Sequence, residues 1–529
     1  MRLKHFFWIG LIIWWPLRAQ QNTDYFEWGR QMELIAAVME QVLNNYVETP
    51  NAEQLGTDAI KGMLKHTDRY TRFYDEQQMF DQRLRQSGHV SGIGVRVRAV
   101  DGGLQIREVL HDTPARKAGL MPGDTIVAID STFLQGLSAA QKDRLIKGKP
   151  GTDVHLLVKR GHDTLSFNIR RRMLDRKAVP YAAMLDDRTG YIRLRKFSKG
   201  ASREVQDALV DLKNQGARQI ILDLRGNPGG LLSEAINTVN LFIPKGKLVV
   251  ETKGRLEKFN RKYFTKRSAI DEDIPLTVLI NNRSASASEI VSGTLQDYDR
   301  ARIVGDTSYG KGLVQRFFPL KYGTYVKITI SKYYLPSGRS IQKRDYWHRD
   351  REGKVTRYRA DTTAFFTEKG RKVYEHGGIA PDIFIPSDTL MPEVKYLSVK
   401  DLLFGFTVDY IRRHKAPASP AALDEHRLAD QYISYAARHH LPFKTSWIEQ
   451  LEKALETARS QKASATQLAD LEQTLKRAEK EAEARLRRGR AHRQLGILLK
   501  RLLIQHYWGD RALAEYDVKN SPVVKRAAR

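Results

Sequence analysis

The sequence predicts an α/β (α+β) core with an inserted β-rich domain, an N-terminal helical cap and a C-terminal helical extension. Three observations lead to this fold class. Apolar residues recur at helical spacing near both ends of the chain, short glycine-punctuated strands fill 88–172, and apolar strand-like runs alternate with helical patterns over 173–390. The 529 residues also exceed what one hydrophobic core can organise, since cores stop growing at roughly 250 to 300 residues.

Composition excludes several kinds of chemistry. The chain is 41% hydrophobic and 28% charged, which is typical of a globular protein, and it contains no cysteine. Thiol catalysis, disulfides and cysteine-bound zinc are therefore excluded. The 14 histidines include no His-Glu-x-x-His pair, and the adjacent His439 and His440 lack the spacing that places two ligands on one helix face. We expect neither a metal nor another cofactor.

The net charge of +28 would suit an anionic partner such as nucleic acid, lipid or cell-wall polymer. No helix-turn-helix, zinc finger or RNP-type aromatic motif accompanies the charge. We therefore expect no nucleic-acid partner and interpret the lysines and arginines as solvated surface groups, with contact to the cell envelope left open.

Residues 1–19 have the features of a secretory signal. Arg2 and Lys4 form a positive start, Phe6–Trp15 is apolar, and Ala19 is a small residue near a cleavage point. The apolar run has about ten residues, whereas a spanning helix needs about twenty, so a permanent membrane anchor is the alternative. We expect export to the periplasm or cell envelope.

Residues 20–87 are predicted to form the helical cap, because apolar residues recur there at steps of three and four. These residues are Met32, Ile35, Ala36, Met39, Val42 and Leu43. Turn formers and aromatic residues over 66–75 end this pattern before a second short helix.

Residues 88–172 have the pattern of short strands separated by glycines, interrupted by one helix at about Ser138–Lys147. The predicted strands are Gly92–Val97, Leu104–Leu110, Thr125–Ile129 and Val154–Val158. The segment Pro114–Asp124 reads Pro-Ala-x-x-Ala-Gly-Leu-x-x-Gly-Asp and leads into a strand. This order of elements resembles a bacterial PDZ domain.

The Gly92-Ile-Gly94 segment is the candidate binding loop of this domain. Glycines let successive backbone N–H groups point at one carboxylate without obstruction from Cβ atoms. A peptide would then add as a strand beside Val95–Val97, with its C-terminal carboxylate in the loop. An ordinary strand bulge is the alternative. The loop residues are Gly92, Ile93, Gly94 and Val95.

Residues 173–390 show the alternation of an α/β core. Its predicted strands include Ile220–Leu224, Leu276–Ile280, Ile303–Val304 and Tyr325–Ile330. Beyond them, 391–529 is helical and charged, and a narrow apolar seam predicts helix pairing within the chain or between chains as a homo-oligomer. The seam consists of Leu468, Leu471, Leu475, Ala478 and Ala482.

Ser286 lies in a turn crowded with small hydroxyl residues, Ser-Ala-Ser286-Ala-Ser, between the strand Leu276–Ile280 and an amphipathic helix. A nucleophile in this place would be exposed at the end of a sheet, where the following N–H groups and the helix dipole stabilise an oxyanion. Taken alone, such a segment is more often a helix N-cap than a catalytic site.

Lys311 is a second candidate catalytic residue. It lies between two glycines at a strand end, in the segment Ser308-Tyr-Gly-Lys311-Gly-Leu-Val-Gln315. The glycines let the backbone approach a neighbouring element. A lysine in a packed α/β core is costly unless it is neutral or paired, and a neutral lysine is a general base.

A third turn, Asp223-Leu-Arg-Gly-Asn-Pro-Gly-Gly230, follows a predicted strand, and its N–H groups could complete an oxyanion hole. It also resembles the Gly-Asn-Ser-Gly-Gly nucleophile turn of trypsin-like periplasmic proteases. In that alternative Pro228 would occupy the nucleophile's place, and no matching His and Asp context is present. We expect Asp223, Arg225 and Asn227 to hold the turn.

Together these motifs resemble the C-terminal processing (tail-specific) peptidases, which are serine proteases with a Ser/Lys dyad and an inserted PDZ domain. The similarity covers about 27–386. Besides the PDZ-like domain it includes the Asp-Arg-Tyr-Thr segment at Asp68, Asp223–Gly230, Ser284–Glu289, Gly310–Gln315, Tyr334–Gln342 and Gly377–Asp382.

The resemblance implies an exported serine endopeptidase that cleaves proteins near or from their C-termini after the PDZ domain binds the tail. Ser286 would be the nucleophile, Lys311 the general base, and Gln315 would orient the lysine. Ser284 and Ser288 are the alternative nucleophiles. The oxyanion hole would consist of backbone N–H groups of Ala287, Gly229 and Gly230.

The partners implied are protein or peptide substrates with free C-termini. A catalytically silent PDZ scaffold and a basic polymer-binding protein with a retained protease core are the alternatives. A scaffold has no need of the complete set of Ser286, Lys311 and Gln315, which favours the enzyme.

Overall fold

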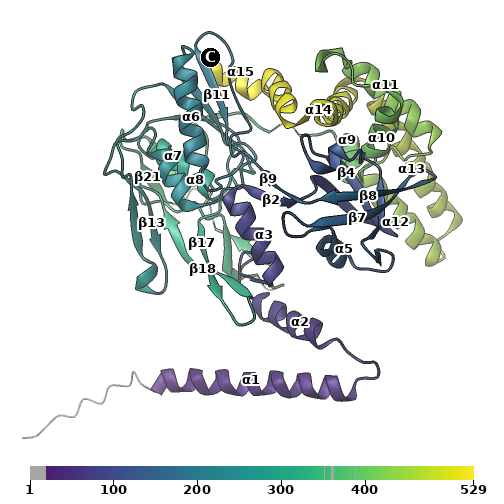
Figure 1. Ribbon diagram of the computed structural model, residues 1–529, viewed down its shortest axis with the longest axis horizontal. Coiled ribbons are helices and arrows are strands. Elements are labelled where there is room, and N and C mark those ends of the chain that lie inside the picture. Colours follow the sequence, from purple (N-terminus) through teal and green to yellow (C-terminus); the bar gives the residue numbers. More distant parts are fainter. Residues whose placement is uncertain (1–18, 351, 359–362, 388) are drawn as a thin grey trace, which may run out of the picture. The chain divides into compact units, whose positions relative to one another are not determined.

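The computed structural model describes residues 19–350, 352–358, 363–387 and 389–529, with side chains from residue 25. The predicted signal therefore lies outside the described residues, except for the backbone of Ala19. The chain divides into two units, Met1–Asp75 with Gln315–Thr329 and Glu76–Val314 with Ile330–Arg529, and each is described by itself (Figure 1). Among the described helices, none combines the length and apolar content needed to cross a bilayer.

The first unit contains the predicted N-terminal helices. Asn51 begins the second helix by accepting the N–H of Gln54 at 2.9 Å. Of the apolar residues that predict the first helix, Met39 and Val42 are partly buried and the others are exposed, with Met32 at 50%. The elements are α1 (Ala19–Asn45), α2 (Ala52–Leu64), β1 (Arg72–Tyr74) and parts of β17 (Leu313–Pro319) and β18 (Tyr325–Tyr334). β1 pairs antiparallel with residues 325–327 of β18.

The second unit begins with α3 (Glu76–Ser87) and a PDZ-like sheet whose strand order is β3-β4-β5-β7-β8, with β6 paired to β5. The strands are β3 (Val95–Val100), β4 (Gly103–Val109), β5 (Thr125–Ile129), β6 (Thr132–Phe133), β7 (Asp153–Arg160) and β8 (Asp163–Arg170). The helices are α4 (Pro114–Lys117) and α5 (Ala139–Ile146), which begins after Ser138 as predicted. β2 (His89–Gly92) and β9 (Arg172–Asp175) pair with each other and connect this sheet to the core.

The core is a sheet of order β10-β11-β12-β15-β16-β23, parallel except for β10. Its central strands are buried on both faces, which explains their continuous apolar runs. The strands are β10 (Tyr181–Met184), β11 (Thr189–Arg193), β12 (Gln219–Asp223), β15 (Leu276–Ile280), β16 (Arg302–Gly305) and β23 (Ile383–Phe384). The helices are α6 (Ala201–Asn214), α7 (Leu232–Val239) and α8 (Ala287–Asp297).

The run Tyr325–Ile330, predicted as another core strand, belongs instead to β18 in a different sheet, and its partly buried to exposed residues differ from the all-buried β15 of the parallel sheet. In the second unit, the end of β18 pairs with β13. The remaining elements are β13 (Leu248–Lys253), η2 (Glu257–Phe259), β14 (Arg261–Phe264), β19 (Arg344–Arg349), β20 (Val355–Arg357), β21 (Ala364–Phe366) and β22 (Lys372–Tyr374).

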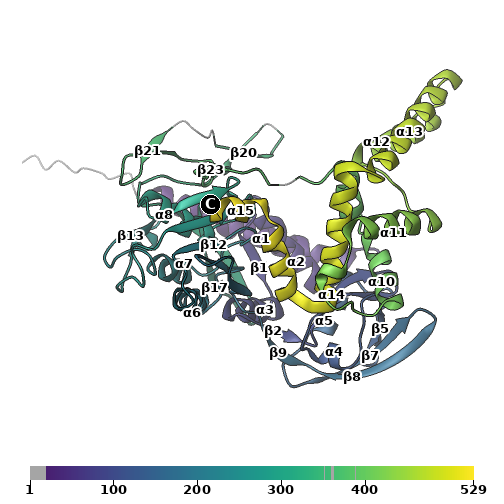
Figure 2. The same cartoon turned by 90° about the horizontal axis from the view of Figure 1, so that it is seen from above.

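The C-terminal extension is helical, as predicted, and α12 and α13 pack side by side within the chain (Figure 2). Arg459 of α12 and Glu472 of α13 form an ion pair of 2.7 Å. Homo-oligomer formation through these helices stays a prediction. The helices are α9 (Pro392–Val399), α10 (Leu403–Arg413), η3 (Pro420–Ala422), α11 (Glu425–Arg438), α12 (Ser446–Ser460), α13 (Ala465–Leu486), α14 (Gly489–Asn520) and α15 (Pro522–Ala528).

This extension packs against both preceding parts of the second unit. Val518 and Val524 lie in one buried cluster with residues of the core sheet, including Tyr191. Toward the PDZ-like sheet, Arg98 pairs with Asp401 at 2.7 Å. The extension therefore covers one face of the core sheet and contacts the PDZ-like domain. These contacts explain why it contains apolar residues that a solvated tail would not need.

Candidate active site

The site forms at one edge of the core sheet because of strand order. β12, β15 and β16 are consecutive parallel neighbours, so the segments that follow them leave from the same edge. These segments are the turn ending in Gly230, the turn containing Ser286 and the loop containing Lys311. Three stretches that are far apart in sequence thus meet at one place.

Ser286 occupies a strained backbone position at the start of α8, with φ 57° and ψ −113°. Its side chain is partly exposed, whereas Ser284 and Ser288 are both fully buried. The Ser284 hydroxyl donates to the Leu224 carbonyl at 2.8 Å, and the Ser288 hydroxyl donates to the Asn227 carbonyl at 2.9 Å. Two of the three serines therefore hold the turns together, and Ser286 is the accessible one.

The turn after β12 is held by its own polar residues. Asp223 forms an ion pair of 2.6 Å with Arg225, and burial alone would raise the pKa of Asp223, but Arg225 outweighs it and lowers the pKa. Asn227 donates to the Leu194 carbonyl at 2.9 Å. Gly229 has φ +95°, and a Cβ there would lie 2.9 Å from the Ser286 Cβ. Only glycine lets this turn lie against Ser286.

Glu289 is the residue that joins the nucleophile turn to the lysine loop. It is fully buried, and one carboxylate oxygen accepts the N–H of Ser286 at 2.7 Å and the N–H of Lys311 at 2.9 Å. The other oxygen accepts the Ser308 hydroxyl at 2.5 Å and the Gly310 N–H at 2.6 Å. Burial raises the pKa of Glu289, although these hydrogen bonds act in the opposite direction.

Tyr333 joins the same two segments from the other side. It is 1% exposed, and its hydroxyl lies within hydrogen-bond distance of the carbonyls of both Lys311 and Ser286. In the sequence, Glu289 stands three residues after Ser286, which is the spacing of a capping box. Its contacts with the lysine loop and the role of Tyr333 depend on tertiary structure and were missed.

The candidate oxyanion donors differ in what they bind. The Gly229 N–H donates to the Asn227 Oδ1 at 2.9 Å, so it is already engaged. The N–H groups of Gly230 and Ala287 donate to no other group in the part of the chain that the structure describes. Of the three predicted donors, these two are available for a substrate oxygen.

Gln315 falls in the first unit, four residues along the chain from Lys311. Within that unit its side-chain amide donates to the Thr329 hydroxyl at 3.2 Å. Its predicted role in orienting the lysine stays a prediction.

The predicted carboxylate loop lies between β2 and β3, and β3 is an edge strand of its sheet. Gly94 has φ +93°, and a Cβ there would lie 2.2 Å from the Thr113 side chain. The Ile93 carbonyl accepts the Ala115 N–H at 2.8 Å, which ties the loop to α4. An unpaired edge beside a fixed glycine loop is the arrangement that strand addition requires.

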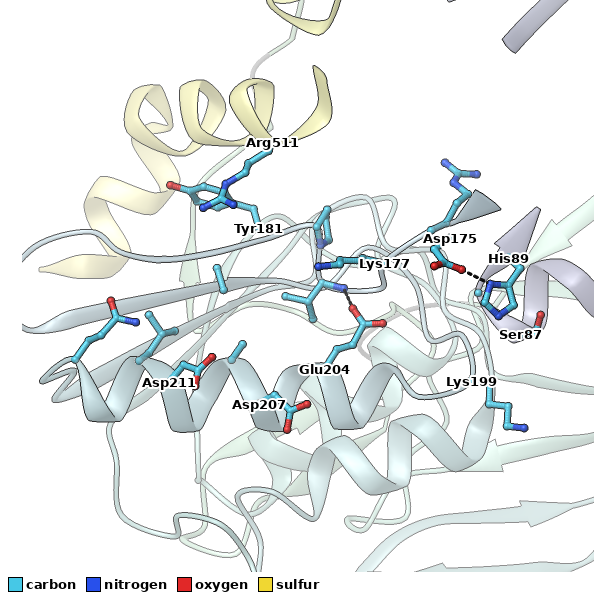
Figure 3. Close-up of a pocket in the computed structure, with 18 residues that line it drawn as sticks. Ser87, His89, Asp175, Lys177, Tyr181, Lys199, Glu204, Asp207, Asp211 and Arg511 are labelled. Atoms are coloured by element: carbon cyan, nitrogen blue, oxygen red, sulfur yellow. Dashed lines mark hydrogen bonds and ion pairs between the residues drawn. The ribbon is translucent and has the colours of Figure 1, made fainter. Parts of the chain in front are cut away.

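Two adjoining cavities lie beside the core, and they share Gly88, His89, Arg176 and Lys177. The wide cavity has a volume of about 770 Å³, and α6 lines it with Glu204, Asp207 and Asp211 (Figure 3). The narrow cavity has a volume of about 200 Å³ and reaches Gly226 and Pro228 of the turn after β12. Of the two, the narrow cavity is therefore the one that borders a turn of the candidate active site.

One group of described residues could hold a metal ion, namely His426, Asp430 and His492. Asp430 lies 3.1 Å from the His426 Nδ1 and 2.9 Å from the His492 Nε2. The group belongs to α11 and α14, and none of its residues lies on the elements that carry Ser286 or Lys311. The four-residue spacing of His426 and Asp430 is visible in sequence, but the approach of His492 is not.

Comparison with known proteins identifies the parts of the chain. Family models match for Peptidase family S41 over 188–346, for PDZ domain over 91–170, and for Probable PDZ-protease, C-terminal helical domain over 394–529. The photosystem II D1 C-terminal processing protease, a solved structure, has 24% identity and a TM-score of 0.37 over 68% of this chain and 88% of its own.

Two curated relatives are more similar in sequence. The carboxy-terminal-processing protease of Bartonella bacilliformis is 36% identical over 61% of this chain and 74% of its own length. The carboxy-terminal processing protease CtpA of Bacillus subtilis is 34% identical over 58% of this chain and 65% of its own length.

The matched domains define a serine-type peptidase that carries a PDZ domain. More narrowly, the chain belongs to the carboxy-terminal processing proteases of peptidase family S41. The predicted family, fold class and enzyme class are thereby confirmed.

Proposed function

We propose that this protein is an exported endopeptidase that binds protein C-termini through its PDZ domain and cleaves them with Ser286 as nucleophile and Lys311 as general base. One observation carries the proposal. A single oxygen of Glu289 accepts the N–H groups of both Ser286 and Lys311, so the two residues are held side by side at the sheet edge.

The cycle is acyl transfer. Neutral Lys311 takes the hydroxyl proton of Ser286 as Oγ bonds to the scissile carbonyl carbon, and the N–H groups of Ala287 and Gly230 bind the oxyanion. The Lys311 ammonium then protonates the leaving nitrogen as the C–N bond breaks. Water attacks the acyl-enzyme through the reverse proton path and restores Ser286. Gln315 would orient the lysine.

Export is part of the proposal on sequence grounds. Arg2, Lys4 and the apolar run Phe6–Trp15 have the order of a secretory signal. The absence of cysteine is compatible with an oxidising compartment, since no thiol needs protection.

The proton role of Lys311 predicts a pH dependence. A lysine base must lose its proton in the free enzyme, so kcat/KM should rise with pH through an apparent pKa below roughly 10.4, the value of an exposed lysine. The measurement is kcat/KM for one fluorogenic peptide across pH, with a solvent isotope effect to show that chemistry limits the rate. A flat profile from mildly acidic to alkaline pH would refute the neutral-lysine mechanism.

Tail binding predicts that amidating the substrate's C-terminus weakens cleavage. Amidation removes the negative charge that the loop N–H groups bind, and the expected effect is on KM rather than on kcat. The comparison uses two peptides that differ only in this group. Gly94→Ala should abolish the difference between them, because a Cβ at that φ would also meet Thr113. Gly102→Ala is the control, since it also has a positive φ but open space around it.

Equal rates for the free-acid and amidated peptides in the unmodified protein would remove the PDZ domain from substrate selection.

A further inference from the structure

The narrow cavity beside the candidate active site is lined by cations and by no carboxylate. We call it the cationic pocket. Its basic lining residues are Arg85, His89, Arg176, Lys177, Arg195 and Lys196.

The described structure offsets the charge of these residues only in part, and Asp510 and Glu108 lie close enough to Arg176 to oppose the lowering of its pKa. Arg195 lies 3.6 Å from Asp510, and His89 pairs with Asp175 at 2.7 Å. The other four form no ion pair among the described residues. Lys196 is half-buried, and burial, followed by the neighbouring Arg85, Arg176 and Arg195, lowers its pKa. Grouping like charges costs free energy, so this arrangement is most stable when an anion occupies the pocket.

The pocket is joined directly to the catalytic turn. Lys196 precedes Phe197, whose N–H donates to the Gly229 carbonyl at 3.2 Å and whose carbonyl accepts the Leu231 N–H at 2.8 Å. Phe197 and Gly230 thus form a parallel bridge. A group bound beside Lys196 therefore lies next to the backbone that carries the candidate oxyanion donor.

The wide cavity has the opposite character on its α6 wall. Figure 3 shows Glu204, Asp207 and Asp211 along that helix, and Glu204 accepts the Val179 N–H at 2.9 Å. An acidic peptide segment would be repelled from this wall. The wide cavity as a whole is mixed in sign, because Lys199 and Arg511 also line it, whereas the titratable residues that line the narrow cavity are all basic. A carboxylate would therefore be favoured in the cationic pocket over the α6 wall.

We infer that the cationic pocket binds a carboxylate of the peptide substrate close to the scissile bond, and that the enzyme therefore prefers acidic substrates. This inference rests on the proposed proteolytic function and specifies its substrate class. The carboxylate is either an Asp or Glu side chain or the terminal carboxylate of a short tail. Arginine and lysine donate charge-assisted hydrogen bonds to both.

The test measures kcat/KM for a series of fluorogenic peptides in which one Glu is moved a residue at a time along an otherwise neutral sequence, with Gln at the same position as its partner. At one position Glu should be preferred over Gln by about tenfold, because hydrogen bonds between charged groups are stronger than neutral ones. A parallel pair with free and amidated C-termini, and no Glu, reports on the terminal carboxylate.

The variant is Arg176→Gln with Lys196→Gln, and the matched control is Lys199→Gln with Arg511→Gln. Both remove two positive charges, but the control residues line only the wide cavity. In the variant the Glu preference should fall to about one while the Gln peptide is still cleaved. The control should keep the preference. Loss of the free-acid preference instead, in the variant alone, would assign the pocket to the terminal carboxylate.

Two outcomes separate this inference from the proposed function. If the unmodified enzyme cleaves Glu and Gln peptides equally at every position, and free and amidated tails equally, the inference is overturned and the proteolytic function stands. If no peptide is cleaved, the function fails, and the inference is decided by fluorescence anisotropy of the uncleaved peptides with Ser286→Ala. Equal Kd values for the Glu and Gln peptides, and for the free and amidated tails, would overturn it.

Discussion

Ser286→Ala and Lys311→Ala should each lower proteolysis by at least about a thousandfold without unfolding the protein, because the nucleophile and its base act as a unit. Both changes keep the Glu289 contacts that join the turns, since those contacts use the backbone N–H groups of both residues. The measurement is hydrolysis of an unfolded protein with a free C-terminus, with Tm recorded for each variant.

Three further variants serve as comparisons for the dyad. Ser284→Ala should keep measurable activity, although it removes a buried hydrogen bond to Leu224 and should lower Tm. Gln315→Ala should give a partial loss, because orientation is less critical than proton transfer. Arg283→Ala changes an exposed residue of the same turn and should behave like the unmodified enzyme. Near-normal turnover of Lys311→Ala would mean that another group is the base.

Glu289→Gln should lower kcat by about a hundredfold with little change in KM, because catalysis depends on the mutual placement of nucleophile and base. The carboxylate accepts four hydrogen bonds. An amide in either orientation would point its NH₂ group at two of those donors, so the contact between the start of α8 and the lysine loop should be weakened. The substrate-binding PDZ domain contains none of these contacts.

The control for Glu289 is Glu234→Gln. Glu234 is also a buried core glutamate, 8% exposed, and it accepts the N–H groups of Gly200 and Ser202 at 3.1 and 2.9 Å. Glu234→Gln therefore shows how much Tm and kcat fall when a buried carboxylate distant from the dyad is replaced. If both variants lose Tm and kcat to the same extent, Glu289 has only a structural role.

A pH profile gives an independent readout of Glu289. Its arrangement of four donors requires the ionised form, and burial raises its pKa above the ordinary value of 4.5. Activity should therefore fall on acidification at a higher pH than an exposed glutamate would give. Glu289→Gln has no such titration, and its residual activity should lose this acidic limb.

The motifs that carry the chemistry were predictable from sequence because each is a local pattern. A buried strand followed by small hydroxyl residues and an amphipathic helix predicted the Ser286 turn, and glycines around Lys311 and over 226–230 predicted close backbone approach. The helix starts after Ser138 and Ser286 follow from capping chemistry within four residues. Such signals need no knowledge of distant neighbours.

The roles of several residues could not be inferred from their neighbours in the sequence. The shared hydroxyl chemistry of Ser284, Ser286 and Ser288 does not distinguish them; the family resemblance favoured Ser286, and burial with carbonyl partners sets Ser284 and Ser288 apart from it in the structure. Tyr325–Ile330 forms a strand as predicted but lies in another sheet than β12, β15 and β16, because an apolar run specifies a strand without specifying its neighbours. The cationic pocket likewise combines α3, the β2/β9 connection and the segment before Phe197.

The sequence by itself determined the fold class, the peptidase family and the residue types available for catalysis. Helix and strand periodicity and glycine turns can be recognised from residues that are close together in sequence. Tertiary structure decided which of these residues meet. The parallel order β12-β15-β16 brings three distant turns to one sheet edge, and the buried Glu289 carboxylate fixes two of them together. Burial and strand order are properties of the whole chain, so the accessible serine and the charge lining the adjoining cavity appear only when the sheet is assembled.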